Sequence, residues 1–406
     1  MRQIRYIKLS SLMFNIALIC VASYAILENV GISIDNFGNI RRPLLFMAAF
    51  CLIPLIGSII KKLKRKEYFL FCMILFIFLG TFSYSTLINR DTVSGSGVVY
   101  ATINLFLYII ELFILMIYAA ENNKVQSVFN LIFRYALLIT IITDVIIFTG
   151  IVHFTDGAFE TYLIGTKFSV VYLHIYLLAF YLLKYSFGKL LSPRQIVMLI
   201  ILSFMAICVS IRIDCNTGII GSMLLVVFVL IFWIYRDKVL KAFSSPLLFL
   251  VFIFGSGIIA FLLERIIQTP AITNLITNTL ERDLTLTGRT EIFSLYTLKM
   301  AGHWLWGYGY GNAYTVSMGL FGYADAQNAL LQWILQVGII PIIFLVLLWA
   351  NIMHHVSMRK DLIKIMPIIA LIYVFIILGT VEITYSMNFF LWMGLLFMWS
   401  HQKSYN

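Results

Sequence analysis

Twelve apolar segments, each close to the length of a membrane-spanning helix, recur along the whole chain and restrict what it can fold into. A helix crossing about 30 Å of hydrocarbon needs about 20 residues, and such a helix satisfies its own backbone groups in lipid. With 62% hydrophobic and 12% charged residues, the chain cannot be a water-soluble domain. We expect an all-α polytopic membrane protein, one integral membrane domain over 1–406. The segments are 9–27, 43–60, 68–88, 98–120, 127–150, 166–187, 195–211, 217–235, 246–263, 326–350, 365–381 and 387–400.

The distribution of Lys and Arg predicts the orientation of these segments. The apolar run 9–27 follows three cations and resembles a signal peptide, but its length and the many later segments favour an uncleaved first helix. With the N-terminus inside, nineteen Lys and Arg lie on the cytoplasmic side and nine outside. We therefore expect a multi-pass plasma-membrane protein with both termini cytoplasmic. The net charge of +11 then reflects cytoplasmic loops and gives no reason to expect nucleic-acid binding.

The connection 264–325, between the ninth and tenth segments, is the one long loop and falls on the predicted outer face. It is rich in apolar residues, and within 290–303 those at positions 292, 293, 295, 296 and 300 fit one helical face. Loops of this length that are not disordered tend to be functional. We expect short helices packed on the mouth of the bundle, carrying the segments that bind substrate.

Arg289 follows Gly288 at the predicted start of that helix, with Glu291 two residues on. A cation at a helix N-terminus opposes the macrodipole, whereas a bound anion would be held by both the N–H groups and the guanidinium. The pattern indicates a phosphate or diphosphate site, with Glu291 as a cap or a base. The alternative is an ion pair of Arg289 with Glu291 or Asp283.

A second polar element, 210–218, joins the seventh and eighth segments at the same face and contains Arg212 and Asp214. Charged residues at a membrane edge usually face a bundle interior or an aqueous cavity. If Arg212 lies near Arg289, the two supply charges that a diphosphate lipid needs. An Arg212–Asp214 pair, or an Arg212 side chain extended to lipid headgroups, is the alternative.

Two further parts of this face carry groups suited to sugars. In Trp306-Gly-Tyr-Gly-Tyr-Gly311 the aromatic rings of Tyr308 and Tyr310 alternate with glycines, and His303 precedes them. This pattern either brings backbone and rings to a ligand or makes a tight turn anchored at the interface.

The segment Asp325-Ala-Gln-Asn328 opens the tenth apolar segment and offers a carboxylate and the amides of Gln327 and Asn328. Asp325 either faces substrate or caps that helix. Glu382, between the last two apolar segments, is a further carboxylate expected at the same face. No metal-ligand spacing accompanies these residues.

Taken together, these motifs resemble those of the bacterial O-antigen and capsular polysaccharide polymerase and O-antigen ligase superfamily. That family has ten to fourteen spans and a late outer loop with a Gly-Arg start, a Gly-aromatic-Gly segment and a His-Asn pair opening the next span. Gly288-Arg289, 307–311 and Gln327-Asn328 occur here in that order, and 210–218 is similar to the family's Arg-bearing connection. The resemblance covers about 205–345 by motif and the whole chain by topology.

The resemblance implies a glycosyltransferase that joins undecaprenyl-diphosphate-linked oligosaccharide repeat units without metal or nucleotide cofactors. Its partners would be membrane lipid, a chain-length regulator and a flippase, with no nucleic acid. We expect Arg212 and Arg289 to stabilise the diphosphate and a carboxylate to act as the base. The carboxylates are Asp325, Glu291 and Glu382, and the sugar-binding residues Tyr308, Tyr310, Gln327, Asn328, Asp214 and His303.

One departure from the family pattern favours a polymerase over a ligase. Gln327 stands where the family has the His that ligases are expected to use in catalysis, and Gln cannot act as a base near neutral pH. The ligase remains one alternative. A flippase or other transporter remains another, although inverted repeats and broken helices at the midplane, which are common in transporters, are not clear in this sequence.

Overall fold

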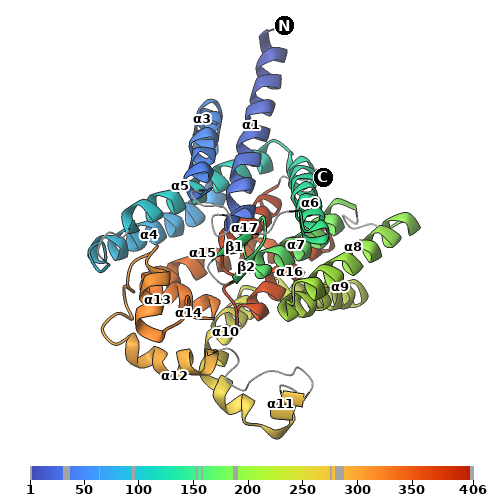
Figure 1. Cartoon of the computed structure of the whole chain (residues 1–406). Helices are drawn as coiled ribbons and strands as arrows, with labels where there is room; N and C mark the ends of the chain where they lie inside the picture. Colours follow the sequence, from blue (N-terminus) through green and yellow to red (C-terminus); the bar gives the residue numbers. More distant parts are fainter. Residues whose placement is uncertain are drawn as a thin grey trace.

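The computed structural model describes residues 2–30, 37–63, 65–93, 97–151, 154–156, 159–185, 191–274, 277–278 and 288–402. Within them the chain is an α-helical bundle with one small β-hairpin (Figure 1). The N-terminal half consists of α1 Arg2–Ile26, α3 Phe37–Leu63, α4 Lys66–Ile88, α5 Val98–Glu121, α6 Val125–Thr149, β1 Phe154–Asp156, β2 Phe159–Thr161, α7 Lys167–Tyr185 and α8 Pro193–Arg212. The remainder consists of α9 Asn216–Phe243, α10 Pro246–Ile267, α11 Pro270–Asn274, α12 Arg289–Lys299, α13 Ala313–Phe321, α14 Ala329–Val337, α15 Ile339–Ser357, η2 Leu362–Lys364, α16 Met366–Leu378 and α17 Met387–Ser400.

Nine helices of the described part are long and apolar enough to cross a membrane. The expectation of an all-α multi-pass membrane protein is therefore confirmed at this level, apart from the hairpin, in which β1 and β2 pair antiparallel with Phe154 opposite Thr161. The nine are α1, α4, α5, α6, α7, α8, α9, α10 and α15.

The tenth apolar segment is not one helix, as the sequence predicted, but two. Gly338, at a positive φ of 80°, separates α14 from α15. A Cβ at Gly338 would overlap the carbonyl oxygen of Leu305. The connection between α12 and α13 stabilises this break, because the N–H of Ile339 donates to the carbonyl of Trp304 at 2.8 Å. An uninterrupted apolar run cannot report such a break, because the groups that cause it come from another segment.

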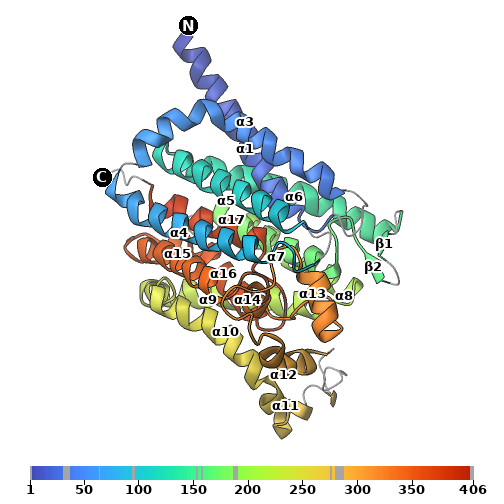
Figure 2. The ribbon, with the colours of Figure 1, turned by 90° about the vertical axis from the view of Figure 1, so that its left-hand side faces the viewer.

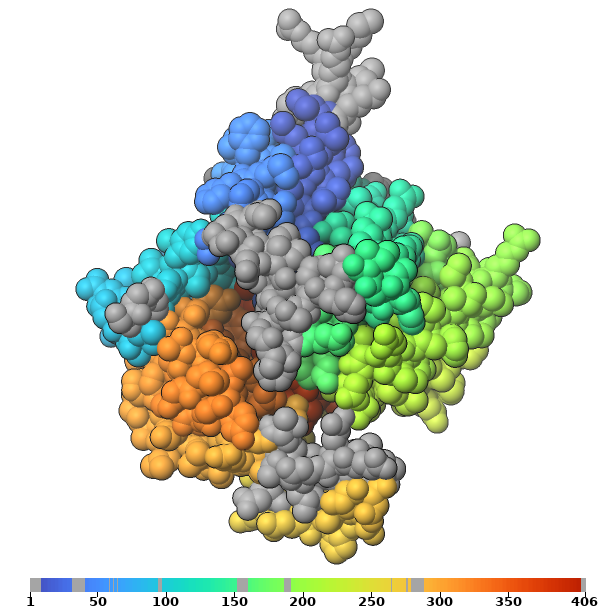
Figure 3. Space-filling view, in the orientation of Figure 1, coloured from blue at the N-terminus to red at the C-terminus, as the bar shows by residue number. Residues whose placement is uncertain are grey.

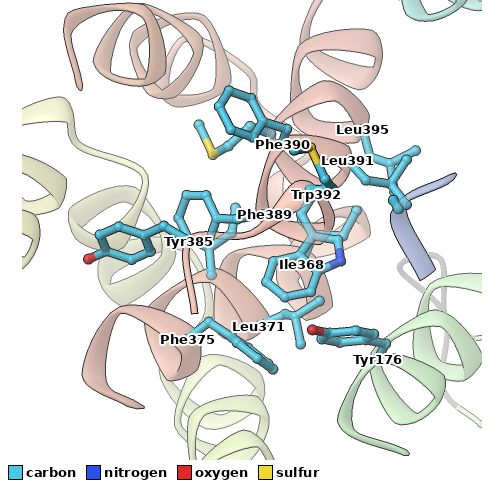
Figure 4. Packing of buried hydrophobic residues seen from close by; sticks show 14 of the residues in the cluster. Tyr176, Ile368, Leu371, Phe375, Tyr385, Phe389, Phe390, Leu391, Trp392 and Leu395 are labelled. Atoms are coloured by element: carbon cyan, nitrogen blue, oxygen red, sulfur yellow. The ribbon is translucent and has the colours of Figure 1, made fainter. Parts of the chain in front are cut away.

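The last two helices form the centre of the bundle. Nearly every side chain of α16 and α17 is buried, whereas outer helices such as α8 and α9 bury few. Figure 4 shows their packing, with Trp392 of α17 beside Phe375 of α16 and Tyr176 of α7. The Trp392 ring centroid lies 4.6 Å from those of both Phe375 and Tyr176. This aromatic core fixes the connection between α16 and α17, which carries Glu382.

The hairpin, α12 and α13 gather at one end of the bundle, which we call the loop face. In Figure 2, β1, β2 and α13 lie at the right-hand end and the C-terminus at the left-hand end. Figure 3 views the loop face, where the orange residues around α13 and the green residues around α7 border the centre, with red C-terminal residues visible at depth between them. The segments singled out from the sequence therefore meet at one end.

The predicted long loop 264–325 is largely helical where it is described. α10 continues to Ile267, and α12 and α13 follow, while 275–276 and 279–287, including Asp283, lie outside the described residues. Of the five positions predicted to form an apolar face in 290–303, positions 292, 293, 296 and 300 are buried, and position 295 is half-buried. α12 begins at Arg289 because Gly288 adopts a φ of 85° there. The absence of a Cβ at Gly288 leaves room for the ring of Tyr323.

Candidate functional site

The centre of the candidate site is an ion pair between Arg289 and Glu382, which are 93 residues apart. Arg289 Nη2 donates to Glu382 Oε1 at 2.8 Å, and its Nε donates to the backbone carbonyl of Val381 at 2.9 Å. The two side chains expose only 15% and 9% of their surface. The guanidinium therefore holds both the carboxylate and the backbone that carries it. Glu291 does not take this role, because its carboxylate accepts a hydrogen bond from Tyr323, and Asp283 lies outside the described residues.

The polar turn between α8 and α9 reaches the same carboxylate, but through residues other than Arg212. Thr217 Oγ1 lies 3.5 Å from Glu382 Oε1. Lys167, at the start of α7, donates to the backbone carbonyl of Asp214 at 2.7 Å, and its charge lowers the pKa of Glu382. Arg212 itself is exposed, and its charge opposes the rise that burial produces in the pKa of Tyr162.

A cavity of about 430 Å³ is lined by Glu382 and by residues from four distant parts of the chain. This volume lies within the range of ligand pockets, roughly 300–1,000 Å³. Three carboxylates, four side-chain amides and several aromatic rings line it, a mixture suited to hydroxyl groups and to the faces of sugar rings. Among the lining residues are Glu28, Asn29, Tyr172, Tyr176, Tyr314, Asp325, Gln327, Gln332, Glu382 and Asn388.

Asp325 and Gln327, two of the residues proposed from the sequence for the site, line this cavity. Asp325 Oδ1 accepts the backbone N–H of Gln327 at 2.8 Å, so Asp325 fixes this turn and does not cap α14. Gln327 has a φ of 52°, a left-handed conformation that is uncommon for a residue with a side chain. Such strain persists only where the surroundings enforce it, and it clusters at functional sites.

Asn328 has a different position from the one expected of a sugar ligand. Its side chain is fully buried and caps α14, accepting the N–H of Leu331 at 3.0 Å. Its amide nitrogen donates to the carbonyls of Ser256 and Thr380 at 3.0 and 3.1 Å. Asn328 therefore joins α14 to α10 and to the end of α16. It does so directly after Gln327, which lines the cavity.

Burial raises the pKa of two carboxylates that line the cavity, Glu382 and Asp325. It raises the pKa of Glu382 to about 7, although the charge of Arg289 pulls that pKa down and Asp325 adds to the rise. Burial also raises the pKa of Asp325, against the N–H of Gln327 and the charge of Arg289. A carboxylate with a pKa near neutrality is suited to accept a proton at physiological pH.

The aromatic-glycine segment 306–311 mainly supports the break between α14 and α15. The N–H groups of Tyr308 and Gly309 donate to the carbonyls of Leu335 and Gln336, which end α14. The ring of Tyr308 stacks on His303 at 3.9 Å, and its hydroxyl donates to the carbonyl of Lys299. Neither Tyr308 nor His303 lines the 430 Å³ cavity.

The other two residues predicted for the site also lie away from that cavity. Tyr310 lines a separate cavity that also contains Arg41. Glu291 is exposed and accepts a hydrogen bond from the hydroxyl of Tyr323 at 3.0 Å. Among the predicted bases, Asp325 and Glu382 are therefore the ones that face the 430 Å³ cavity.

Sequence reasoning missed two residues at this site, Glu28 and Lys167. Glu28 follows the first apolar run, lines the cavity, and accepts the N–H of Met387 at 3.1 Å. The available signal was the same one that drew attention to Glu382, a carboxylate between two apolar segments at the predicted outer face. Lys167 was counted only as an outside cation that fixes topology.

The described residues contain no group of three or more His, Cys, Asp and Glu side chains placed to hold a metal ion. Comparison of the chain with protein-family models, with curated proteins and with solved structures found no match.

Proposed function

We propose that the chain is a polysaccharide polymerase of the bacterial plasma membrane. It would join undecaprenyl-diphosphate-linked oligosaccharide repeat units at the outer face. The observation that carries the proposal is the loop-face cavity, in which Glu382, held by Arg289, faces the amides and rings described above. The resemblance of the motifs to the polymerase and ligase superfamily supports the same function. The net charge of the chain gives no reason to propose nucleic-acid binding instead.

The reaction needs one proton acceptor and one leaving group. A hydroxyl oxygen of the incoming unit forms a bond to the anomeric carbon of the growing chain. The bond between that carbon and the diphosphate oxygen breaks, and its electron pair leaves with the diphosphate. The hydroxyl proton passes to a carboxylate, and we assign this role to Glu382, because burial places its pKa at about 7.

The neighbours of Glu382 would position it and the sugars. Arg289 and Thr217 fix its Oε1, which leaves Oε2 for the hydroxyl. Asp325 and Gln327 would accept and donate hydrogen bonds to sugar hydroxyls, and Tyr314 would stack on a ring face. The diphosphate supplies the activation, so that the transfer requires no nucleotide.

The size of the glycan tests this proposal in cells that lack the chain and are complemented with the wild type or with Glu382→Gln. A polymerase predicts that single lipid-linked repeat units accumulate outside, and that Glu382→Gln fails to restore chain length. Full-length polymer trapped on its lipid would indicate a ligase. Repeat units confined to the cytoplasmic leaflet would indicate a flippase, and either result would overturn the proposal.

Glu291→Gln is the matched control for this experiment. Glu291 is also a carboxylate of the loop region but is exposed and faces Tyr323. The control should restore polymer of normal length at normal expression.

A further inference from the structure

A second cavity, of about 330 Å³, lies next to the first at the loop face, and Glu28 lines both. It is lined by the start of α3, the start of α5 and the end of the aromatic-glycine segment, which contributes Tyr310. Its charged lining residues are two arginines, Arg41 and Arg42, and Glu28.

Aromatic rings hold both guanidinium groups by their faces. The Arg41 carbon Cζ lies 4.2 Å from the ring centre of Tyr24, and that of Arg42 lies 4.2 Å from the ring centre of Tyr100. Stacking of this kind fixes the plane of a guanidinium while its N–H groups point outward along the edge. The arginines are thereby oriented before any ligand arrives.

Arg41 has hydrogen-bonding capacity that its surroundings do not satisfy. One Nη donates to the backbone carbonyl of Glu28 at 2.6 Å. Its Nε is buried and has no hydrogen-bond partner among the described residues. A buried donor without an acceptor is costly, and in a cation-lined cavity an anionic oxygen would remove that cost.

The two cavities differ in the charged side chains that line them. The first is lined by the carboxylates of Glu28, Asp325 and Glu382. The guanidinium of Arg289 is paired with Glu382, and the charge of Arg41, from the second cavity, acts on Glu28. The second is lined by two guanidinium groups and one carboxylate. A sugar diphosphate has a neutral part and an anionic part, and each would find its complement in one of these adjoining cavities.

We propose that the second cavity binds the diphosphate of the lipid-linked glycan through Arg41 and Arg42. Arg289 then positions the base and does not hold the leaving group. This inference rests on the proposed function, and it places the charge that develops on the diphosphate beside two fixed cations. The sugar attached to the diphosphate extends past Glu28 into the first cavity.

The test measures binding, without any reaction, on the purified full-length protein in detergent. Undecaprenyl diphosphate is titrated while the unfolding temperature is followed. Wild type should be stabilised, and Arg42→Gln should need at least about tenfold more lipid, because a lost hydrogen bond to a charged group costs about that factor. Arg41→Gln should behave alike, and inorganic diphosphate should compete with the lipid for wild type.

Arg90→Gln is the matched control, an exposed arginine at the same face that pairs with Asp91. It should bind the lipid as wild type does. Equal affinity in Arg41→Gln, Arg42→Gln and wild type would overturn the inference. So would an equal, Arg42-dependent stabilisation by phosphatidylglycerol, which would indicate a general phospholipid site. Inorganic diphosphate that binds but is not displaced by the lipid would indicate a site for free anions and would also overturn it.

The design separates this inference from the proposed function. Glu382→Gln should bind undecaprenyl diphosphate as tightly as wild type while making no polymer. If cells lacking the chain still polymerise normally, the proposed function fails, whereas Arg42-dependent binding stands or falls on its own titration.

Discussion

Two buried carboxylates, each paired with an arginine, lie at opposite ends of the bundle, and they differ in what else surrounds them. At the loop face, Arg289 holds Glu382 at 2.8 Å. At the other end, Arg65 holds Glu121 at 2.6 Å, with Lys62 at 3.6 Å and the hydroxyl of Tyr68 at 3.0 Å. The comparison teaches that a close ion pair alone does not make a reactive site.

The difference lies in the number of donors and in the cavity. Glu121 exposes 1% of its side chain and is surrounded by two cations and a phenol, an arrangement typical of a structural anchor at the end of a helix. Glu382 has a guanidinium on one oxygen and a cavity of about 430 Å³ beside it. A carboxylate is available for chemistry when its partners leave one oxygen free to meet a substrate.

The largest effect should come from Glu382→Gln. Loss of a general base typically lowers a rate by about 10²–10⁴, and we expect at least a hundredfold loss of polymerisation. In wild type the rate should fall as pH drops below about 7, because protonation removes the base. A purified lipid-linked repeat unit, incubated with protein in vesicles across pH 5–9, gives both measurements. A normal rate in the variant would remove Glu382 from catalysis.

Arg289→Ala should have the next largest effect. The Arg289 charge lowers the pKa of Glu382, so its removal raises that pKa and leaves less base at neutral pH. We expect the rate at pH 7 to fall at least about tenfold and the acid limb of the pH profile to move upward. Arg289→Lys, which keeps the charge, should move the limb less. An unshifted limb in a folded Arg289→Ala protein would contradict this role.

Glu121→Gln should affect stability and leave the chemistry unchanged. Removing the carboxylate leaves Lys62 and Arg65 without their common partner, although these side chains are 23% and 41% exposed and can reach water. We expect a loss of roughly 2 kcal/mol, below the usual cost of breaking a fully buried pair. The unfolding midpoint in detergent measures the loss. The polymerisation rate per folded molecule should equal that of wild type. A lower rate would show that the Glu121 cluster contributes to the reaction as well as to stability.

The smallest effect should come from Glu291→Gln. The exposed carboxylate accepts one hydrogen bond from Tyr323, and pairs at the surface contribute little. Both the rate and the unfolding midpoint should stay close to wild type in the same two assays. A large loss of rate would show that the loop face uses a carboxylate outside the cavity.

Much of the fold could be predicted from the sequence, because apolar run length determines where helices lie in a lipid-soluble chain. The hydrophobic face of α12 and its start at Arg289 were also predictable, since periodicity and Gly288 encode them locally. The break at Gly338 was not predictable, because the backbone of Trp304 and Leu305 creates it. The apolar composition of 326–350 reads the same whether the helix is broken or continuous.

The site was predictable in its residue types but not in its pairings. Glu382 and Arg289 were both identified, yet their contact depends on how α16 and α17 pack in the core. Asn328 was expected to bind sugar because an amide at a membrane edge suggests it. The same amide satisfies the start of α14 and two carbonyls. Sequence cannot tell a buried cap from a ligand, because both use the same donors.

The lengths of the two central helices bear on how far a substrate must leave the lipid. α16 and α17 have 13 and 14 residues, or about 20 Å each at 1.5 Å per residue. This is roughly 10 Å less than the hydrocarbon thickness of a bilayer, so that Glu382, which joins them, can lie in a depression below the level where longer helices emerge. A glycan would then approach sideways, with its prenyl chain still among the acyl chains. Acyl-chain length in reconstituted vesicles would, on this geometry, control the depth of that depression and with it the rate.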